Sequence, residues 1–84
     1  MPPITIYGTT WCPDCWRAKT FLKERGVHFQ EINIEDDPQA EEFVLRANNG
    51  RRKVPTIKVG ERHFTCSPFS ARKLAEELKI PLNN

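Results

Sequence analysis

The chain has 84 residues, 38% of them hydrophobic, and a formal net charge of +2, so we expect one small domain over 1–84 and no nucleic-acid partner. The sequence contains no run of about 18 apolar residues, so we expect no membrane-spanning helix. Because the amino terminus also lacks the basic and apolar segments of a signal peptide, we predict a cytoplasmic protein.

The first part of the chain predicts a strand followed by a helix. The β-rich run "PITIYG" predicts a strand over about 3–7. A helix is expected over about 13–25, because Pro13 suits a first helical turn and Gly26 would end the pattern.

The next part repeats this order. The β-branched residues of the run "VHFQEINI" favour a second strand over about 28–33. Asp37 is then a suitable cap, Pro38 suits a first turn, and the run Asn48-Asn49-Gly50 would end a second helix.

The last part predicts a hairpin and a final helix. Two short strands over 54–65 flank Gly60 and Glu61. In the final helix, Ser67 is the expected cap and Pro68 the expected first-turn proline. Its expected apolar face consists of Phe69, Leu74, Ala75 and Leu78.

The predicted element order is therefore βαβαββα. A βαβ unit followed by a hairpin and a helix indicates one four-stranded mixed sheet flanked by three helices, with helices on both faces. The expected fold class is α/β.

The motif Cys12-Pro13-Asp14-Cys15 lies where the first strand gives way to the first helix. At a helix amino terminus, unpaired N–H groups and the positive end of the dipole favour a thiolate. Pro13 has no N–H and presets the first turn. We therefore predict that Cys12 is exposed and nucleophilic, and that Cys15, about one helical turn further in, is less accessible and resolves mixed disulfides. Two incidental core thiols are the alternative.

Three other residues around the motif are open to more than one interpretation. Asp14 suits a helix amino terminus, but its charge opposes a nearby thiolate. Trp11 is either a flat apolar contact for a partner or a half-buried packing residue. Cys66, just before the final helix, is a small core hydrophobe, a regulatory thiol or an accessory resolving cysteine.

The available ligands do not favour a metal site. The cysteines and histidines of the chain are Cys12, Cys15, Cys66, His28 and His63. A structural zinc site normally needs four ligands, and no second close pair completes a set here. Both histidines look like ordinary strand positions. Three cysteines are also too few for a disulfide scaffold.

Three segments carry a resemblance to a known family: "TIYGTTWCPDCWRAKTFL", "RRKVPTIKVG" and "TCSPFSARKL". With Cys-Pro-x-Cys in the first segment and Val54-Pro55 in the second, the chain resembles a glutaredoxin of the thioredoxin fold over nearly its whole length. The resemblance implies a thiol–disulfide oxidoreductase whose Pro55 is cis and faces the cysteines. It also implies that the backbone of Val54 binds a disulfide-linked substrate. An ordinary proline at a strand start is the alternative for Pro55.

Four positions depart from the family members that use glutathione. Thr9 stands where those proteins usually have a lysine, Lys53 replaces the first residue of their Thr-Val-Pro segment, and Asp14 replaces an aromatic residue. Their Gly-Gly turn is replaced by Thr65-Cys66-Ser67-Pro68. Because of these departures, the sequence resembles the mycoredoxin branch of the family more than its glutathione-using members, and the NrdH-type redoxins are the next most similar group.

In the fold that this resemblance implies, Arg51, Arg52 and Lys53 would lie on the rim of the site. Three cations would favour a thiolate, offset the charge of Asp14, and attract an acidic partner surface or a carboxylate-bearing thiol. Solvated surface is the alternative.

The resemblance implies that the protein reduces protein disulfides, or mixed disulfides of S-thiolated proteins, as a monomer with no bound cofactor. Its reductant would be a low-molecular-weight thiol (mycothiol, bacillithiol or glutathione) or thioredoxin reductase. The substrate-binding residues would be Trp11, Pro13, Asp14, Val54, Pro55, Arg52, Lys53, Cys66 and Ser67. Two alternatives stay open: an electron donor for ribonucleotide reductase that thioredoxin reductase recharges, and an iron–sulfur or metal carrier.

Overall fold

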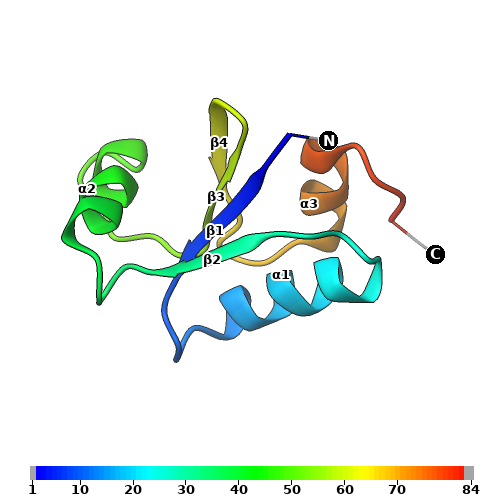
Figure 1. Ribbon diagram of the computed structural model, residues 1–84, viewed down its shortest axis with the longest axis horizontal. Helices are drawn as coiled ribbons and strands as arrows, with labels where there is room; N and C mark the ends of the chain where they lie inside the picture. The colour runs from blue at the N-terminus through cyan, green and yellow to red at the C-terminus, as the bar shows by residue number, and fades with distance from the viewer. Residues whose placement is uncertain (1, 83–84) are drawn as a thin grey trace.

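Four strands form one sheet in the computed structural model, which describes residues 2–82 (Figure 1). In chain order, the elements are β1 (Ile4–Gly8), α1 (Pro13–Glu24), β2 (Gln30–Asn33), α2 (Pro38–Ala47), β3 (Thr56–Val59), β4 (Arg62–Thr65) and α3 (Ala71–Leu78). The strand order is β2-β1-β3-β4, with β1 parallel to β2 and the other pairs antiparallel. The predicted element order and the mixed four-stranded sheet are confirmed.

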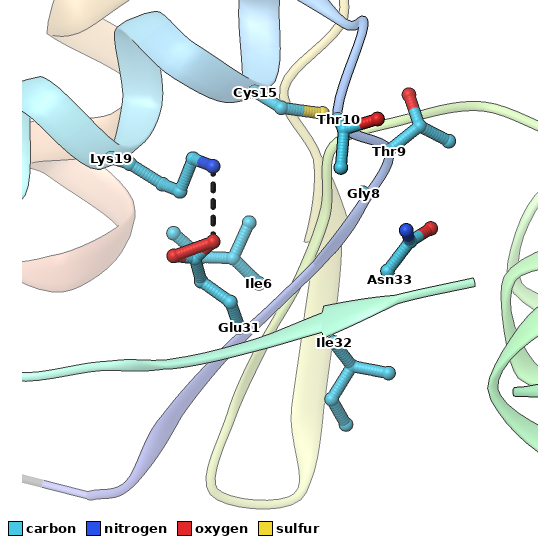
Figure 2. A pocket seen from close by; sticks show the side chains of 9 residues that line it. All are labelled: Ile6, Gly8, Thr9, Thr10, Cys15, Lys19, Glu31, Ile32 and Asn33. Carbon is cyan, nitrogen blue, oxygen red and sulfur yellow. Dashed lines mark hydrogen bonds and ion pairs between the residues drawn. The ribbon is translucent and has the colours of Figure 1, made fainter. Parts of the chain in front are cut away.

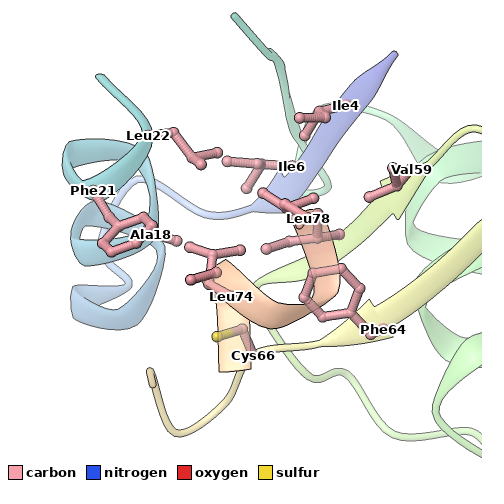
Figure 3. Packing of buried hydrophobic residues seen from close by; sticks show 12 residues of the cluster. Ile4, Ile6, Ala18, Phe21, Leu22, Val59, Phe64, Cys66, Leu74 and Leu78 are labelled. Carbon is pink, nitrogen blue, oxygen red and sulfur yellow. The ribbon is translucent and has the colours of Figure 1, made fainter. Parts of the chain in front are cut away.

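The sheet separates two hydrophobic clusters. The larger cluster lies between the sheet and the helices α1 and α3, and Figure 3 shows Leu22 close to Ile6 and Leu74 close to Ala18. The smaller cluster contains Ile34 and Val44 and lies against α2 on the other face. Side chains alternate between the two faces along β1, as they do in any strand, so this one central strand contributes to both clusters.

Two of the predicted helices begin where the sequence placed them. The Asp37 side chain accepts a hydrogen bond of 3.1 Å from the backbone N–H of Ala40 and caps α2. After α1, Gly26 has a φ of +68°, a conformation that glycine adopts without steric cost.

None of the helices within residues 2–82 is long and apolar enough to cross a membrane.

The predicted start of the final helix is wrong. Ser70, not Ser67, caps α3, because its hydroxyl accepts a hydrogen bond of 3.1 Å from the backbone N–H of Lys73. The cis Ser67–Pro68 peptide precedes the helix. Phe69 also lies outside the helix, where its ring packs edge-on against Phe21 with centroids 6.4 Å apart. Ser67 and Ser70 both offer a capping hydroxyl. The helix α3 begins after Ser70, where Phe69 is free to pack against Phe21 of α1.

The second strand is also shorter than predicted. Strand β2 begins at Gln30, so His28 is an exposed loop residue rather than a strand residue. His63 lies in β4, as expected, and packs against Phe43 with ring centroids 5.6 Å apart. That residues 1–84 form one domain stays a prediction.

Candidate active site

Cys12 is the N-cap residue of α1. Its Sγ accepts a hydrogen bond of 3.1 Å from the backbone N–H of Cys15, so sulfur takes the place that a side-chain oxygen usually occupies in a cap. Pro13 occupies the first turn, as predicted. A negative charge on this sulfur is favoured by the N–H group and by the positive end of the helix dipole. The geometry therefore suits a thiolate at position 12.

The prediction that Cys12 is exposed is wrong. Only 7% of the residue is accessible, because its side chain turns back onto the start of α1 to cap the helix. The same sulfur lies 3.7 Å from the carbonyl oxygen of Val54, to which the protonated thiol donates. The Cys12 side chain therefore has a hydrogen-bond partner in either protonation state.

Cys15 is almost completely buried, with 1% of its surface accessible. Burial and a hydrogen bond with Cys12 raise the pKa of Cys15 to about 12, while a backbone hydrogen bond with Thr9 and, to a smaller extent, the positive charge of Lys19 lower it. The Cys15 thiol is therefore protonated at neutral pH. It is less accessible than Cys12, as the sequence predicted, and it must lose a proton before it can attack a disulfide.

Gly8, the last residue of β1, is a site residue that sequence reasoning missed. A Cβ atom at this position would lie 2.6 Å from the Sγ of Cys15, which is far inside van der Waals contact. Only glycine therefore allows the end of β1 to approach the buried thiol so closely. The available signal was a glycine at a strand end four residues before the first cysteine.

We expect Gly8→Ala to lower the free energy of unfolding of the reduced protein by about 1–3 kcal/mol, because the added methyl group overpacks the site. Chemical denaturation measures this loss. In a Cys15→Ala background the loss should shrink, since the sulfur is gone and the two positions are coupled. Equal losses in both backgrounds would contradict the close contact.

The segment before β3 brings the backbone towards the cysteines. The Val54–Pro55 peptide is cis, as the resemblance implied. The Pro55 carbonyl accepts a hydrogen bond of 3.0 Å from the backbone N–H of Cys66. This bond and the contact between Val54 and the Cys12 sulfur place residues from three parts of the chain around one site.

Asn48 and Thr56 hold this segment in place, and sequence reasoning missed both. The Thr56 hydroxyl is fully buried and donates to the Lys53 carbonyl at 2.8 Å. The Asn48 amide donates to the same hydroxyl at 3.0 Å and to the Val44 carbonyl at 2.8 Å. These bonds tie the end of α2 to the residues around the cis proline.

Trp11 is exposed, not half-buried as one interpretation of the sequence had it. Its exposed fraction is 64%, and its indole N–H donates to a carboxylate oxygen of Glu35 at 3.2 Å. Trp16, on the first turns of α1, is exposed to the same degree, at 65%. Two large aromatic surfaces therefore flank the motif and face solvent.

The charges around the motif are paired differently from the prediction. The Asp14 carboxylate lies 3.0 Å from the Arg17 guanidinium on the same helix. Arg52 lies 2.9 Å from Glu41 and 3.9 Å from Glu35, so its charge is directed to these acids rather than to the thiols. Lys53 is exposed. Exposed pairs of this kind contribute about 0–1 kcal/mol each.

Cys66 is fully buried in the larger cluster (Figure 3). Its sulfur lies 3.7 Å from the carbonyl oxygen of Ser70, to which it donates. Burial raises the pKa of the Cys66 thiol. Among its three interpretations, the geometry favours a small core hydrophobe, while the neighbouring Ser67 is exposed.

The described residues contain no group of three or more His, Cys, Asp or Glu side chains that could hold a metal ion. The sulfurs of Cys12 and Cys15 form a dithiol arrangement at a helix amino terminus, opposite the cis proline Pro55. This arrangement can exchange thiols and disulfides: one sulfur is placed for attack, and a second lies one helical turn away.

Comparisons with known proteins agree with this chemistry. The family model described as Glutaredoxin matches residues 4–64. A glutaredoxin of Pseudomonas aeruginosa is 46% identical over 84 residues, which is 99% of this chain and 99% of that protein. Mycoredoxin 1 of Corynebacterium glutamicum is 34% identical over 77 residues, covering 90% of this chain and 94% of its own. The solved structure of the glutaredoxin-like protein NrdH-redoxin from Escherichia coli matches with a TM-score of 0.64 and 35% identity, over 75% of this chain and 80% of that one.

Proposed function

Because the chain belongs to the glutaredoxin family and is therefore a thiol–disulfide oxidoreductase of the thioredoxin-like fold, we propose that Cys12 is its nucleophile and Cys15 its resolving thiol. The observation that carries this assignment is the 3.1 Å hydrogen bond from the Cys15 backbone N–H to the Cys12 sulfur. It stabilises charge on one of the two sulfurs, while burial keeps the other protonated.

The reaction has two steps. The Cys12 thiolate attacks one sulfur of the substrate disulfide, a mixed disulfide forms, and the other substrate sulfur leaves as a thiolate that takes up a proton. Cys15 then loses its proton and attacks the Cys12 sulfur, so the Cys12–Cys15 disulfide forms and the second substrate sulfur is released. The protein loses two electrons and the substrate disulfide gains them.

We propose protein disulfides and mixed disulfides of S-thiolated proteins as the substrates. A mixed disulfide with a small thiol permits a shorter route, in which Cys12 takes the small thiol and a second molecule of that thiol releases it. Trp11 and the backbone of Val54 are the proposed contacts for the substrate chain, since one is exposed beside Cys12 and the other touches its sulfur. We place the protein in the cytoplasm, because a dithiol donor needs a reducing compartment. We further propose that it acts as a monomer.

The proposed reductant is a low-molecular-weight thiol other than glutathione, for which mycothiol and bacillithiol are the candidates. Thr9 and the segment around Ser67 stand where the resemblance expects glutathione contacts, and Mycoredoxin 1 is among the relatives. The similarity to NrdH-redoxin makes thioredoxin reductase the second candidate reductant.

One assay tests this proposal. The oxidised protein is offered glutathione, mycothiol, bacillithiol, or thioredoxin reductase with its nicotinamide cofactor, and the rate at which free thiols appear is measured. We expect the rate with mycothiol or bacillithiol to exceed the rate with glutathione. Faster reduction by glutathione would show that Thr9 and Ser67 do not weaken its binding, and reduction by the reductase alone would favour the ribonucleotide reductase donor.

A further inference from the structure

A cavity of about 50 Å³ lies beside the Cys15 thiol, between the end of β1, the helix α1 and the strand β2 (Figure 2). Its polar lining residues are Thr9, Thr10, Lys19, Glu31 and Asn33. The hydroxyl of Thr9 is buried and has no hydrogen-bond partner among the described residues. A site that is polar and exceeds about 10–15 Å³ can hold water. Water can therefore lie next to the Cys15 thiol, which must lose its proton before it can attack.

An ion pair closes one side of this cavity. Lys19 follows Cys15 by four residues on α1, so the two side chains lie on one helix face, with Cβ atoms about 5–6 Å apart. Figure 2 shows Lys19 reaching from α1 to Glu31 on β2, and the ammonium and carboxylate lie 3.0 Å apart. The Lys19 side chain is 23% exposed and that of Glu31 is 49% exposed. The charge nearer the interior is therefore the positive one.

The titratable groups that face the Cys15 thiol come from α1 and β2, and the residues from β1 are uncharged. Helix α1 contributes Cys12 and Lys19, and β2 contributes Glu31. Strand β1 and the turn after it contribute Ile6, Gly8, Thr9 and Thr10, none of which carries a charge. Lys19 is thus the one cation that lines this cavity in the described part of the chain.

We propose that the Lys19–Glu31 ion pair sets the rate of the resolving step: Lys19 stabilises the Cys15 thiolate across the cavity, while Glu31 orients Lys19 and offsets part of its charge. As Cys15 attacks the Cys12 sulfur, its proton passes to water in the cavity and from there to solvent. Lys19 acts through Cys15 and does not touch the substrate, so it is a positioning residue. This inference rests on the proposed roles of Cys12 and Cys15.

The size of the effect follows from two opposing trends. Losing one nearby cation reduces the thiolate population by about tenfold for each unit of pKa. The thiolate that remains is a stronger nucleophile, because the logarithm of its attack rate rises by about 0.4–0.5 for each unit of pKa. This gain offsets about half of the tenfold loss on a logarithmic scale, which leaves a net loss of about threefold for each unit. We therefore expect Lys19→Met to slow the resolving step at neutral pH, by about threefold for each unit of pKa that the charge of Lys19 supplies, and to shift its pH–rate profile upwards.

The symmetrical disulfide of thionitrobenzoate separates the two steps, because each step releases one coloured thionitrobenzoate. The fast first phase reports attack by Cys12, and the second phase reports attack by Cys15. The second phase is followed by stopped-flow absorbance from about pH 6 to about pH 10. Glu31→Gln should speed the second phase and shift its profile downwards, because the amide still accepts from Lys19 but carries no charge.

Two matched variants complete the test. Arg72→Met removes an exposed cation on α3 that does not line the cavity, and should leave both phases unchanged. Lys19→Arg keeps the charge and should keep the profile of the unmodified protein, which also covers the case in which Lys19→Met fails to fold. Unchanged second phases in Lys19→Met and Glu31→Gln, or shifts of the same sign in both, would overturn the inference. Loss of the first phase would instead contradict the proposed role of Cys12.

Discussion

Cys12→Ser should abolish disulfide reduction. We expect less than a few per cent of the original turnover, both with protein disulfides and with mixed disulfides of a small thiol. The reason is that no other described thiol is ready to attack. The pKa of Cys15 is raised to about 12, so this thiol is protonated at neutral pH, and a thiol is a far weaker nucleophile than a thiolate. Cys66 is fully buried and its pKa is also raised.

The measurement compares turnover of insulin disulfides and of a peptide carrying a small-thiol mixed disulfide. Cys66→Ala is the matched control, because it removes a cysteine whose sulfur lies in the hydrophobic cluster (Figure 3). We expect this control to retain its activity, with some loss of stability from the small cavity it creates. Substantial turnover by Cys12→Ser would contradict the assignment of the nucleophile.

Cys15→Ser should divide the two substrate classes. With a small-thiol mixed disulfide, a second molecule of free thiol can release the first from Cys12, so activity should stay within about threefold of the original. With a protein disulfide, Cys12 becomes linked to a bulky partner, and only a thiol held one helical turn away resolves that link quickly. We expect a loss of about a hundredfold or more there, because the effective concentration of Cys15 is lost.

The site itself supports this comparison. The hydrogen bond to the Cys12 sulfur comes from the backbone N–H of residue 15, which serine keeps. The smaller oxygen also fits the space against Gly8, where the sulfur leaves no room for a side chain. Equal losses on both substrate classes would indicate a purely dithiol redoxin, and no loss on either class would contradict the resolving role of Cys15.

The sequence predicted the parts of the structure that depend on neighbouring residues. Pro13 marked the start of α1, and the cap Asp37 with Pro38 marked the start of α2, because these signals depend on contacts within a few residues of the chain. The start of α3 could not be placed this way. Ser67 and Ser70 fit a cap equally well in the sequence, and the observed helix begins after Ser70, with Phe69 packed against α1.

The features of the site that were missed depend on contacts between distant segments. The need for glycine at position 8 appears only when α1 brings the Cys15 sulfur against the end of β1. The pairing of Arg52 with Glu41 and Glu35 joins the basic residues 51–53 to the acidic stretch between residues 31 and 42, two stretches that are separate in the sequence. The burial of Cys12 depends on the direction of its own side chain, which the motif does not specify.

The nucleophile can be identified by determining which sulfur carries the trapped partner. The Cys15→Ser variant is mixed with a protein disulfide substrate, quenched with alkylating reagent, digested without reductant and mapped by mass spectrometry. The proposed roles predict a single mixed disulfide between the substrate and Cys12, with Cys66 alkylated only after unfolding. A substrate peptide linked to Cys66, or no covalent complex while reduction continues, would contradict Cys12 as the nucleophile.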